Sequence, residues 1–216
     1  YIDYIGQKLV KNSRRTDLTY YIKVIDSDEV NAFALPGGYL YVNRGLIEAA
    51  DNEAELASVM GHEIAHVTEK HATKQYTKAQ LYQIASTIGT MAVGGAAGRA
   101  GQMVSGFGGA LLFRKFSRLD ESEADRYGLD YMVKSGYDPQ AAVTFFEKLI
   151  RLQKAKLSTL ETLFSTHPPT EERIEDIKSQ IQQLSSDMKT HLRLSSDRFK
   201  KVKTKLRVKS QIRSKD

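Results

Sequence analysis

Residues 58–72, SVMGHEIAHVTEKHA, restrict the fold of this chain more than any other stretch. A capping signal at Asn52 and Glu55 precedes them and predicts a helix that runs through Ala72. Apolar residues recur along it at helical spacing: Leu56, Val59, Met60, Ile64 and Val67. The chain must therefore fold so that this helix is largely buried.

Two histidines and a glutamate on the same helix have the spacing of a metal site. His62 and His66 lie about 40° apart around the helix axis, so both imidazoles face one point, as Zn²⁺ ligands do. Glu63 projects beside them, where it can take a proton from a water on the metal. A buried His-Glu-His cluster without a metal would be costly to desolvate. The stretch therefore predicts a metal site with a base beside it, and disfavours a charged surface helix.

Composition limits what else the chain can be. With 216 residues, 41% of them hydrophobic, it can bury the core of one domain, and with no cysteine any metal site must consist of His, Asp and Glu. The net charge of +6 comes from the C-terminus, since residues 186–216 hold 11 Lys/Arg against 3 Asp/Glu. The rest of the chain carries a net −2, so we expect no nucleic-acid partner. We predict a domain over 1–185 and a basic tail over 186–216.

The order of patterns predicts an α+β fold, mostly helical with a small antiparallel sheet. A helix opens the chain at residues 1–10, and 18–26 (LTYYIKVID) is a strand pattern. Residues 30–47 hold two apolar runs joined by Pro36-Gly37-Gly38, which indicates a hairpin. Further helices are expected after Ser117, after the Asp138-Pro139 pair and after the Pro-rich turn at 166–170.

Residues 79–98 carry no charge. Their length suggests a membrane span, but two glutamines, several hydroxyls and a cluster of glycines favour a Gly/Ala-rich helix or a mobile loop. The sequence does not fix the role of residues 79–113.

A zinc site needs a third protein ligand. Metzincins would have Gly at 69 and His at 72, where this chain has Glu69 and Ala72, and His71 is expected to point away as an exposed or outer residue. In gluzincins the third ligand is a Glu from a later helix, and an Asp four residues after it hydrogen-bonds a ligand histidine. The stretch ESEAD offers Glu121 and Asp125 at that spacing. Glu123 is the competing ligand and is disfavoured because it lies about 200° around the helix from Glu121.

The chain resembles the gluzincin metallopeptidase family that includes the CAAX prenyl endopeptidase, the HtpX heat-shock protease and the periplasmic BepA-type proteases. Four stretches match in order: VNAFALPGGYLYV, GHEIAH, ESEADRYG and STHPPTEERI. Because clear transmembrane helices are lacking, it is similar to the soluble or peripheral bacterial branch. The resemblance implies the zinc ligands His62, His66 and Glu121, one Zn²⁺ per chain, and Glu63 as catalytic base.

The resemblance also implies hydrolysis of peptide bonds. Zn²⁺ would lower the pKa of its bound water, and Glu63 would accept the proton and pass it to the leaving amine. The strand around Asn31, Ala32, Phe33 and Ala34 is expected to be an edge that docks an extended substrate through its backbone, with Asn31 hydrogen-bonding the substrate. The alternative for this strand is an ordinary core strand.

His167, in STHPPTEERI, is placed by the resemblance at the rim of the zinc site. As a hydrogen-bond donor it would stabilise the oxyanion of the reaction. As a neutral imidazole it would instead occupy the open zinc position and hold the enzyme latent. The sequence slightly favours the donor.

The basic tail contains VKTKLRVK, in which Val202, Thr204, Leu206 and Val208 alternate with basic residues. The period of two predicts a strand with one basic face, which could contact an anionic membrane surface. The alternative is a solvated, partly disordered terminus.

These observations predict a zinc endopeptidase that acts on unfolded or misassembled polypeptides. The alternative is a chaperone-like assembly or binding factor with a structural or latent zinc site. The chain starts at Tyr1, so any targeting segment lies upstream. A periplasmic or membrane-associated extracytoplasmic location in a bacterium is expected by resemblance, and the oligomeric state is not encoded in any pattern we identify.

Overall fold

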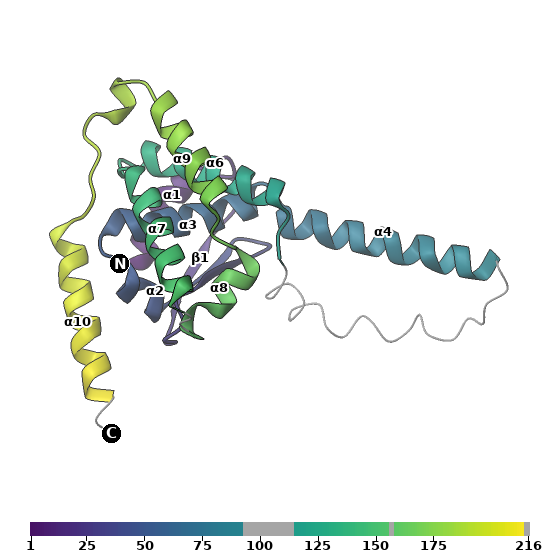
Figure 1. The fold of residues 1–216 in the computed structure, drawn as a ribbon, viewed down its shortest axis with the longest axis horizontal. Helices are drawn as coiled ribbons and strands as arrows, with labels where there is room; N and C mark the ends of the chain where they lie inside the picture. Colours follow the sequence, from purple (N-terminus) through teal and green to yellow (C-terminus); the bar gives the residue numbers. More distant parts are fainter. Residues whose placement is uncertain (93–114, 156–157, 214–216) are drawn as a thin grey trace.

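The computed structural model of the protein describes residues 1–92, 115–155 and 158–213, and the side chains of residues 1–81, 115–155 and 158–208 (Figure 1). The N-terminal part contains α1 (Ile2–Lys11), β1 (Tyr21–Ile25), β2 (Ala32–Leu35), β3 (Tyr39–Asn43), α2 (Arg44–Ala49), α3 (Glu53–Thr68) and α4 (His71–Ala92). The C-terminal part contains α6 (Arg118–Lys134), α7 (Gln140–Lys154), η2 (Ser158–Leu160), α8 (Glu161–Thr166), α9 (Glu171–Gln183), η3 (Asp187–Lys189) and α10 (Asp197–Arg213). The mostly helical α+β class is confirmed.

The sheet has three strands in the order β1-β3-β2, and it is mixed where a wholly antiparallel sheet was expected. β2 and β3 form the predicted antiparallel hairpin, and Gly37 and Gly38 in its turn both have positive φ, which glycine adopts without strain. β1 pairs parallel to β3. One face buries Ile22, Leu40 and Val42, and β2 is left at an edge.

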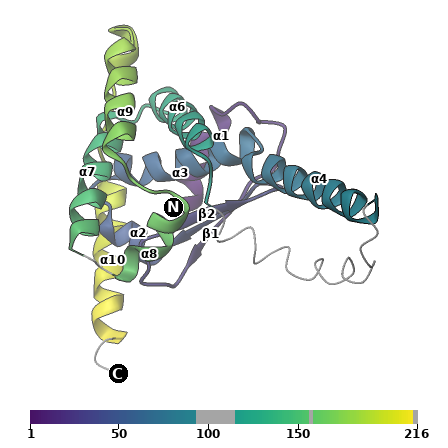
Figure 2. The ribbon, with the colours of Figure 1, turned by 45° about the vertical axis from the view of Figure 1, so that its right-hand side comes forward.

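Helix α3 is the centre of the domain. It packs on β2, α1, α6 and α7 (Figure 2). The predicted cap is present, since the Asn52 side chain accepts a hydrogen bond from the Glu55 N–H. Gly61 of α3 faces Gly128 of α6, and a Cβ on Gly128 would lie 2.8 Å from the backbone nitrogen of His62. The two helices therefore approach closely enough to share one site.

The helix predicted to reach Ala72 ends at Thr68, and α4 begins at His71. Lys70 lies between them with φ of 59°, a left-handed conformation that interrupts the helical path. This break changes the direction of His71. Of the two alternatives predicted for His71, exposure is wrong, because its side chain is fully buried, and an outer position is found, because it contacts His66 from outside the ligand group.

The strand predicted around residues 202–209 is wrong, because this segment lies within α10. Ser196 caps the helix through a hydrogen bond from the Phe199 N–H. Phe199 is buried in the core, and Leu206 packs against that core from the same side of the helix. This spacing of seven residues, two helical turns, explains why helix is preferred over the alternation of two.

The uncharged stretch 79–98 begins inside α4, which projects from the rest of the domain in Figure 1. Its remainder, from residue 93, lies outside the described residues. Among the residues that the structure describes, no helix combines the length and the hydropathy that crossing a membrane requires.

Candidate metal centre

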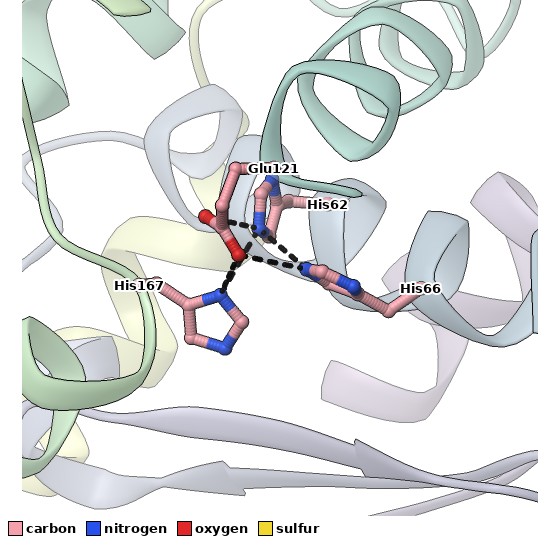
Figure 3. A group of neighbouring side chains, drawn as sticks. All are labelled: His62, His66, Glu121 and His167. Carbon is pink, nitrogen blue, oxygen red and sulfur yellow. Dashed lines mark hydrogen bonds and ion pairs between the residues drawn. The ribbon is translucent and has the colours of Figure 1, made fainter. Parts of the chain in front are cut away.

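Four side chains from three parts of the chain meet at one point (Figure 3). His62 and His66 come from α3, Glu121 comes from the first turn of α6, and His167 follows α8. All four are buried, and one ligand atom of each lies within 4.8 Å of the others. The group contains the residues that the resemblance implied as ligands, together with His167.

The distances between the ligand atoms are short. His62 Nε2 lies 3.0 Å from His66 Nε2 and 3.5 Å from Glu121 Oε2, and His66 Nε2 lies 3.4 Å from Glu121 Oε1. His167 Nδ1 lies 2.9 Å from Glu121 Oε1 and 3.3 Å from His62 Nε2. Two imidazole nitrogens that face each other across 3.0 Å need a shared proton or a cation between them.

Asp125 lies behind His62, on the side away from the cluster. Its Oδ1 is 2.8 Å from His62 Nδ1, so the imidazole donates to the carboxylate and directs Nε2 toward the cluster. Arg173 of α9 holds Asp125 in turn, through two bonds of 2.7 Å from Nε and Nη2. Its Nη1 forms an ion pair of 2.7 Å with Glu121 Oε2. One buried guanidinium therefore fixes the carboxylate of the cluster, Glu121, and the carboxylate that orients His62.

Burial and neighbouring charges move the pKa values of these groups in different directions. Burial lowers the pKa of His66 well below 6.5. Burial also lowers the pKa of His62, but hydrogen bonds with Asp125 and Glu121 outweigh it and raise this pKa to about 10. Burial raises the pKa of Glu121, but the His167 charge and hydrogen bonds from the imidazoles lower it overall, so Glu121 stays ionised. Opposite charges thus stabilise an anionic ligand at the centre.

Glu63 projects from α3 between the cluster and the edge of the sheet. Its Oε2 accepts a hydrogen bond of 3.1 Å from the Ala34 N–H, and its Oε1 lies 3.5 Å from His167 Nε2. Burial raises the pKa of Glu63 above its usual value of 4.5, which makes this carboxylate a stronger base. The free edge of β2 therefore faces the residue predicted as catalytic base.

The other residues expected on this strand are divided between the interior and the surface. Asn31 and Ala32 are buried, and Asn31 Oδ1 has no hydrogen-bond partner among the described residues. Phe33 is partly exposed and stacks on Tyr41 with ring centroids 5.2 Å apart. Ala34 is linked to the cluster by the hydrogen bond from its N–H to Glu63.

Two hollows flank the cluster. A cavity of about 50 Å³ beside His62 and Glu63 is lined mainly by apolar side chains of α6, α7 and α9, such as Met132, Phe145 and Ile177. A wider hollow of about 330 Å³ lies on the other side of His66, along Ala34 to Gly37.

The sequence profile of Peptidase family M48 matches residues 1–181. The chain belongs to peptidase family M48. The β-barrel assembly-enhancing protease of Escherichia coli K12 is 34% identical over 193 residues, which cover 85% of this chain. Metalloprotease LoiP of the same organism is 35% identical over 161 residues, covering 74% of this chain and 62% of LoiP. Mitochondrial metalloendopeptidase OMA1 of Schizosaccharomyces pombe is 30% identical over 194 residues, covering 87% of this chain and 56% of OMA1. The chain spans 39% of the length of the E. coli assembly-enhancing protease.

Membership of M48 implies a metal, and the donor set of this M48 chain fits one. Tetrahedral zinc with bonds of about 2.0–2.1 Å needs ligand atoms about 3.3 Å apart. Five of the six pairs among the four groups have separations of 2.9 to 3.5 Å, and all four ligand atoms lie within 4.8 Å of one another. Glu121 Oε2 is buried and makes no hydrogen bond within the described part of the chain, and its charge is paired with Arg173 Nη1 at 2.7 Å.

Two residues of this M48 site escaped the sequence analysis. Arg173 lies in the STHPPTEERI stretch used for the resemblance, but nothing in its local pattern distinguishes it from an exposed arginine of a polar helix. Phe116 stacks on the His66 ring with centroids 4.0 Å apart. Glu123, the competing ligand, lies apart from the four ligand groups and contacts His71 at 3.0 Å.

Proposed function

We propose that this chain is the catalytic part of a zinc-dependent endopeptidase that binds one Zn²⁺ through His62, His66 and Glu121. The observation that supports this most is the convergence of these three buried ligands with a glutamate next to them and a free strand edge beyond it. When bound, the metal supplies a Lewis acid that polarises the scissile carbonyl and lowers the pKa of a water molecule.

The residues of the chain then perform the proton transfers and hold the substrate. Glu63 accepts a proton from the attacking water and delivers it to the leaving amine, and its raised pKa matches this double role. An extended substrate pairs with the edge of β2 near Ala34, which displaces the hydrogen bond between Ala34 and Glu63 and frees the base. Asn31 is proposed to contact the substrate backbone at the far end of this edge.

His167 has two possible roles, and the distances favour one. Its Nδ1 lies within the ligand group, 2.9 Å from Glu121 Oε1. We therefore propose that His167 occupies the fourth metal position in this conformation and leaves it when substrate binds. The oxyanion-donor role requires the imidazole to face the substrate carbonyl in the open enzyme.

The apolar cavity beside His62 and Glu63 is proposed to accept a small apolar side chain next to the cleaved bond. The mixture of cleaved peptides from an unfolded protein should then show apolar residues enriched on one side of the cleavage sites. No such enrichment would remove this assignment.

Backbone pairing along β2 selects extended chains without reading their sequence, so unfolded or misassembled polypeptides are the proposed substrates. One relative is named for enhancing β-barrel assembly, and a periplasmic or envelope setting is proposed for this chain by similarity.

The test is hydrolysis of unfolded casein by the purified chain after loading with Zn²⁺. We expect one zinc per chain, loss of both zinc and hydrolysis after a chelator, and recovery of both on adding zinc back. His62→Ala should bind zinc at least about tenfold more weakly. A chain that binds no zinc, or hydrolysis that survives the chelator, would contradict the proposal.

A further inference from the structure

His71 is fully buried beside the metal centre, although it is not one of the four ligand groups. Both of its ring nitrogens have partners: Nδ1 lies 2.8 Å from His66 Nδ1, and Nε2 lies 3.0 Å from Glu123 Oε2. Glu123 is partly exposed, so the contacts run from the metal centre to the surface of α6.

The direction of each hydrogen bond follows from the metal-facing nitrogen. His66 directs Nε2 toward His62 and Glu121, so this nitrogen needs its lone pair to bind a cation and the hydrogen of His66 must be on Nδ1. That hydrogen can only be donated to His71 Nδ1, which must then be an acceptor. The hydrogen of His71 is therefore on Nε2 and is donated to the Glu123 carboxylate.

The two ligand histidines are thus supported in different ways. His62 donates directly to a carboxylate, Asp125, which Arg173 neutralises. Among the described residues, the partner of His66 Nδ1 is not a carboxylate but the imidazole of His71. His71 reaches this position because Lys70, with φ of 59°, breaks the helix and lets α4 begin one residue later.

We propose that His71 and Glu123 are positioning residues that fix the tautomer and orientation of His66 for metal binding. This inference rests on the proposed zinc site and assigns its outer support on the His66 side. Support of this kind is typically worth 10- to 100-fold in metal affinity.

Two variants of equal shape separate hydrogen bonding from packing. In His71→Asn the amide oxygen takes the place of Nδ1 and still accepts from His66, whereas His71→Leu fills the same space without an acceptor. Zinc affinity is measured for the 216-residue chain of each variant by competition with a chromogenic chelator, and thermal unfolding of the metal-free proteins checks the fold. We expect His71→Leu to bind zinc about 10- to 100-fold more weakly and His71→Asn to stay within about fivefold of the parent.

Equal zinc affinity for His71→Leu and the parent would overturn the inference, and so would equal losses in both variants. If His71→Leu does not fold, nitrogen NMR of the zinc-loaded parent gives the answer directly. The proposal requires hydrogen on Nδ1 of His66 and on Nε2 of His71, and any other tautomer at His71 overturns it. A parent that binds no zinc would instead refute the proposed function itself.

Discussion

At the scale of single residues, the centre is organised around charges that are buried in compensating pairs. Arg173 is buried and contacts both Asp125 and Glu121, so the site holds a guanidinium against two carboxylates before any metal is considered. Removing one member of such a set leaves the other charges without compensation. The residue with the largest predicted effect on the metal-free fold is therefore Arg173, which is not itself a proposed ligand.

Arg173→Met keeps much of the aliphatic part of the side chain, which packs near Phe146, and removes the charge. We expect the free energy of unfolding of the metal-free protein to fall by about 3–5 kcal/mol, because Asp125 and Glu121 lose their counter-charge. Denaturant unfolding at neutral pH measures this. The exposed Arg118 is the control, since its ion pair with Glu172 is at the surface and Arg118→Met should change stability by less than about 1 kcal/mol. Similar losses in both variants would contradict this account.

His167→Ala distinguishes the two roles of that residue. If His167 blocks the fourth metal position, hydrolysis of unfolded casein by the zinc-loaded variant rises above that of the parent. If His167 stabilises the oxyanion, kcat falls by about 10²–10³. The distances to Glu121 and His62 favour the rise. An unchanged rate would exclude both roles.

The shared face of His62 and His66 on one helix was predictable from their i, i+4 spacing, whereas Glu121 and His167 were named because of the family resemblance. Arg173 and the direction of His71 were not predictable, for two different reasons. Arg173 acts across two helices, so its partners are far away in the sequence. The direction of His71 depends on one left-handed residue, Lys70, and lysine gives no sequence signal for that conformation.

At the scale of helices and strands, the close contact between α3 and α6 brings His62, Glu63 and His66 next to Glu121. Gly128→Ala places a methyl group within 3.0 Å of three backbone atoms of Gly61 and His62, which cannot move aside as a side chain can. We expect a loss of about 1–3 kcal/mol in the free energy of unfolding and weaker zinc binding, because α6 must shift away from α3. Lys134→Ala, on the exposed end of α6, should change neither. Parent-like stability and zinc binding in Gly128→Ala would show that the two helices can separate at no cost.

Elements whose partners are local in sequence were predicted well, and those with distant partners were not. The β2-β3 hairpin follows from its turn residues, whereas the parallel pairing of β1 with β3 depends on how the chain crosses over. Likewise, VKTKLRVK alternates as a strand would, but the buried Phe199, which lies before that stretch, decides for a helix. The periodicity of the stretch alone cannot predict a contact made by a residue outside it.

At the scale of the whole molecule, the C-terminal segment is connected to the start of the central helix. Glu53, the first residue of α3, is buried and accepts a 2.8 Å hydrogen bond from Tyr137 and another from Ser196. Arg193 lies 3.3 Å from the same carboxylate. The division into a domain over 1–185 and a tail over 186–216 stays a prediction. These contacts mean that any test of the tail should use point substitutions in place of deletion.

Glu53 also predicts a dependence of stability on pH. Burial raises its pKa, but the hydrogen bonds from Ser196 and Tyr137 outweigh burial and lower the pKa below 4.5. The folded state therefore binds the proton less tightly than the unfolded state, so the contribution of Glu53 is complete above pH 4.5 and is lost as pH falls through the lowered pKa. We expect Glu53→Gln to cost about 1–3 kcal/mol in unfolding free energy at pH 7 and clearly less at pH 3.5. An equal cost at both pH values would contradict this.

The exposed lysines of α10 test contact with an anionic surface. We propose that they attract anionic lipid, at about 1 kcal/mol for each basic residue near the membrane. The fraction of protein that sediments with vesicles of anionic lipid should fall for the double variant Lys201→Glu/Lys205→Glu. The matched control, Lys134→Glu with Lys154→Glu, changes the net charge equally at exposed positions away from α10 and should bind like the parent. Equal binding by both double variants would remove the proposal.

The central claim is that Glu63 acts as the base of a zinc-dependent hydrolysis, and Glu63→Gln tests it most directly. The substitution keeps the size of the side chain and all three proposed ligands, so the variant should still bind one zinc per chain. We predict that the zinc-loaded variant hydrolyses unfolded casein about 10²–10⁴ times more slowly than the zinc-loaded parent. Hydrolysis at the parent's rate by a fully zinc-loaded Glu63→Gln protein would contradict the account.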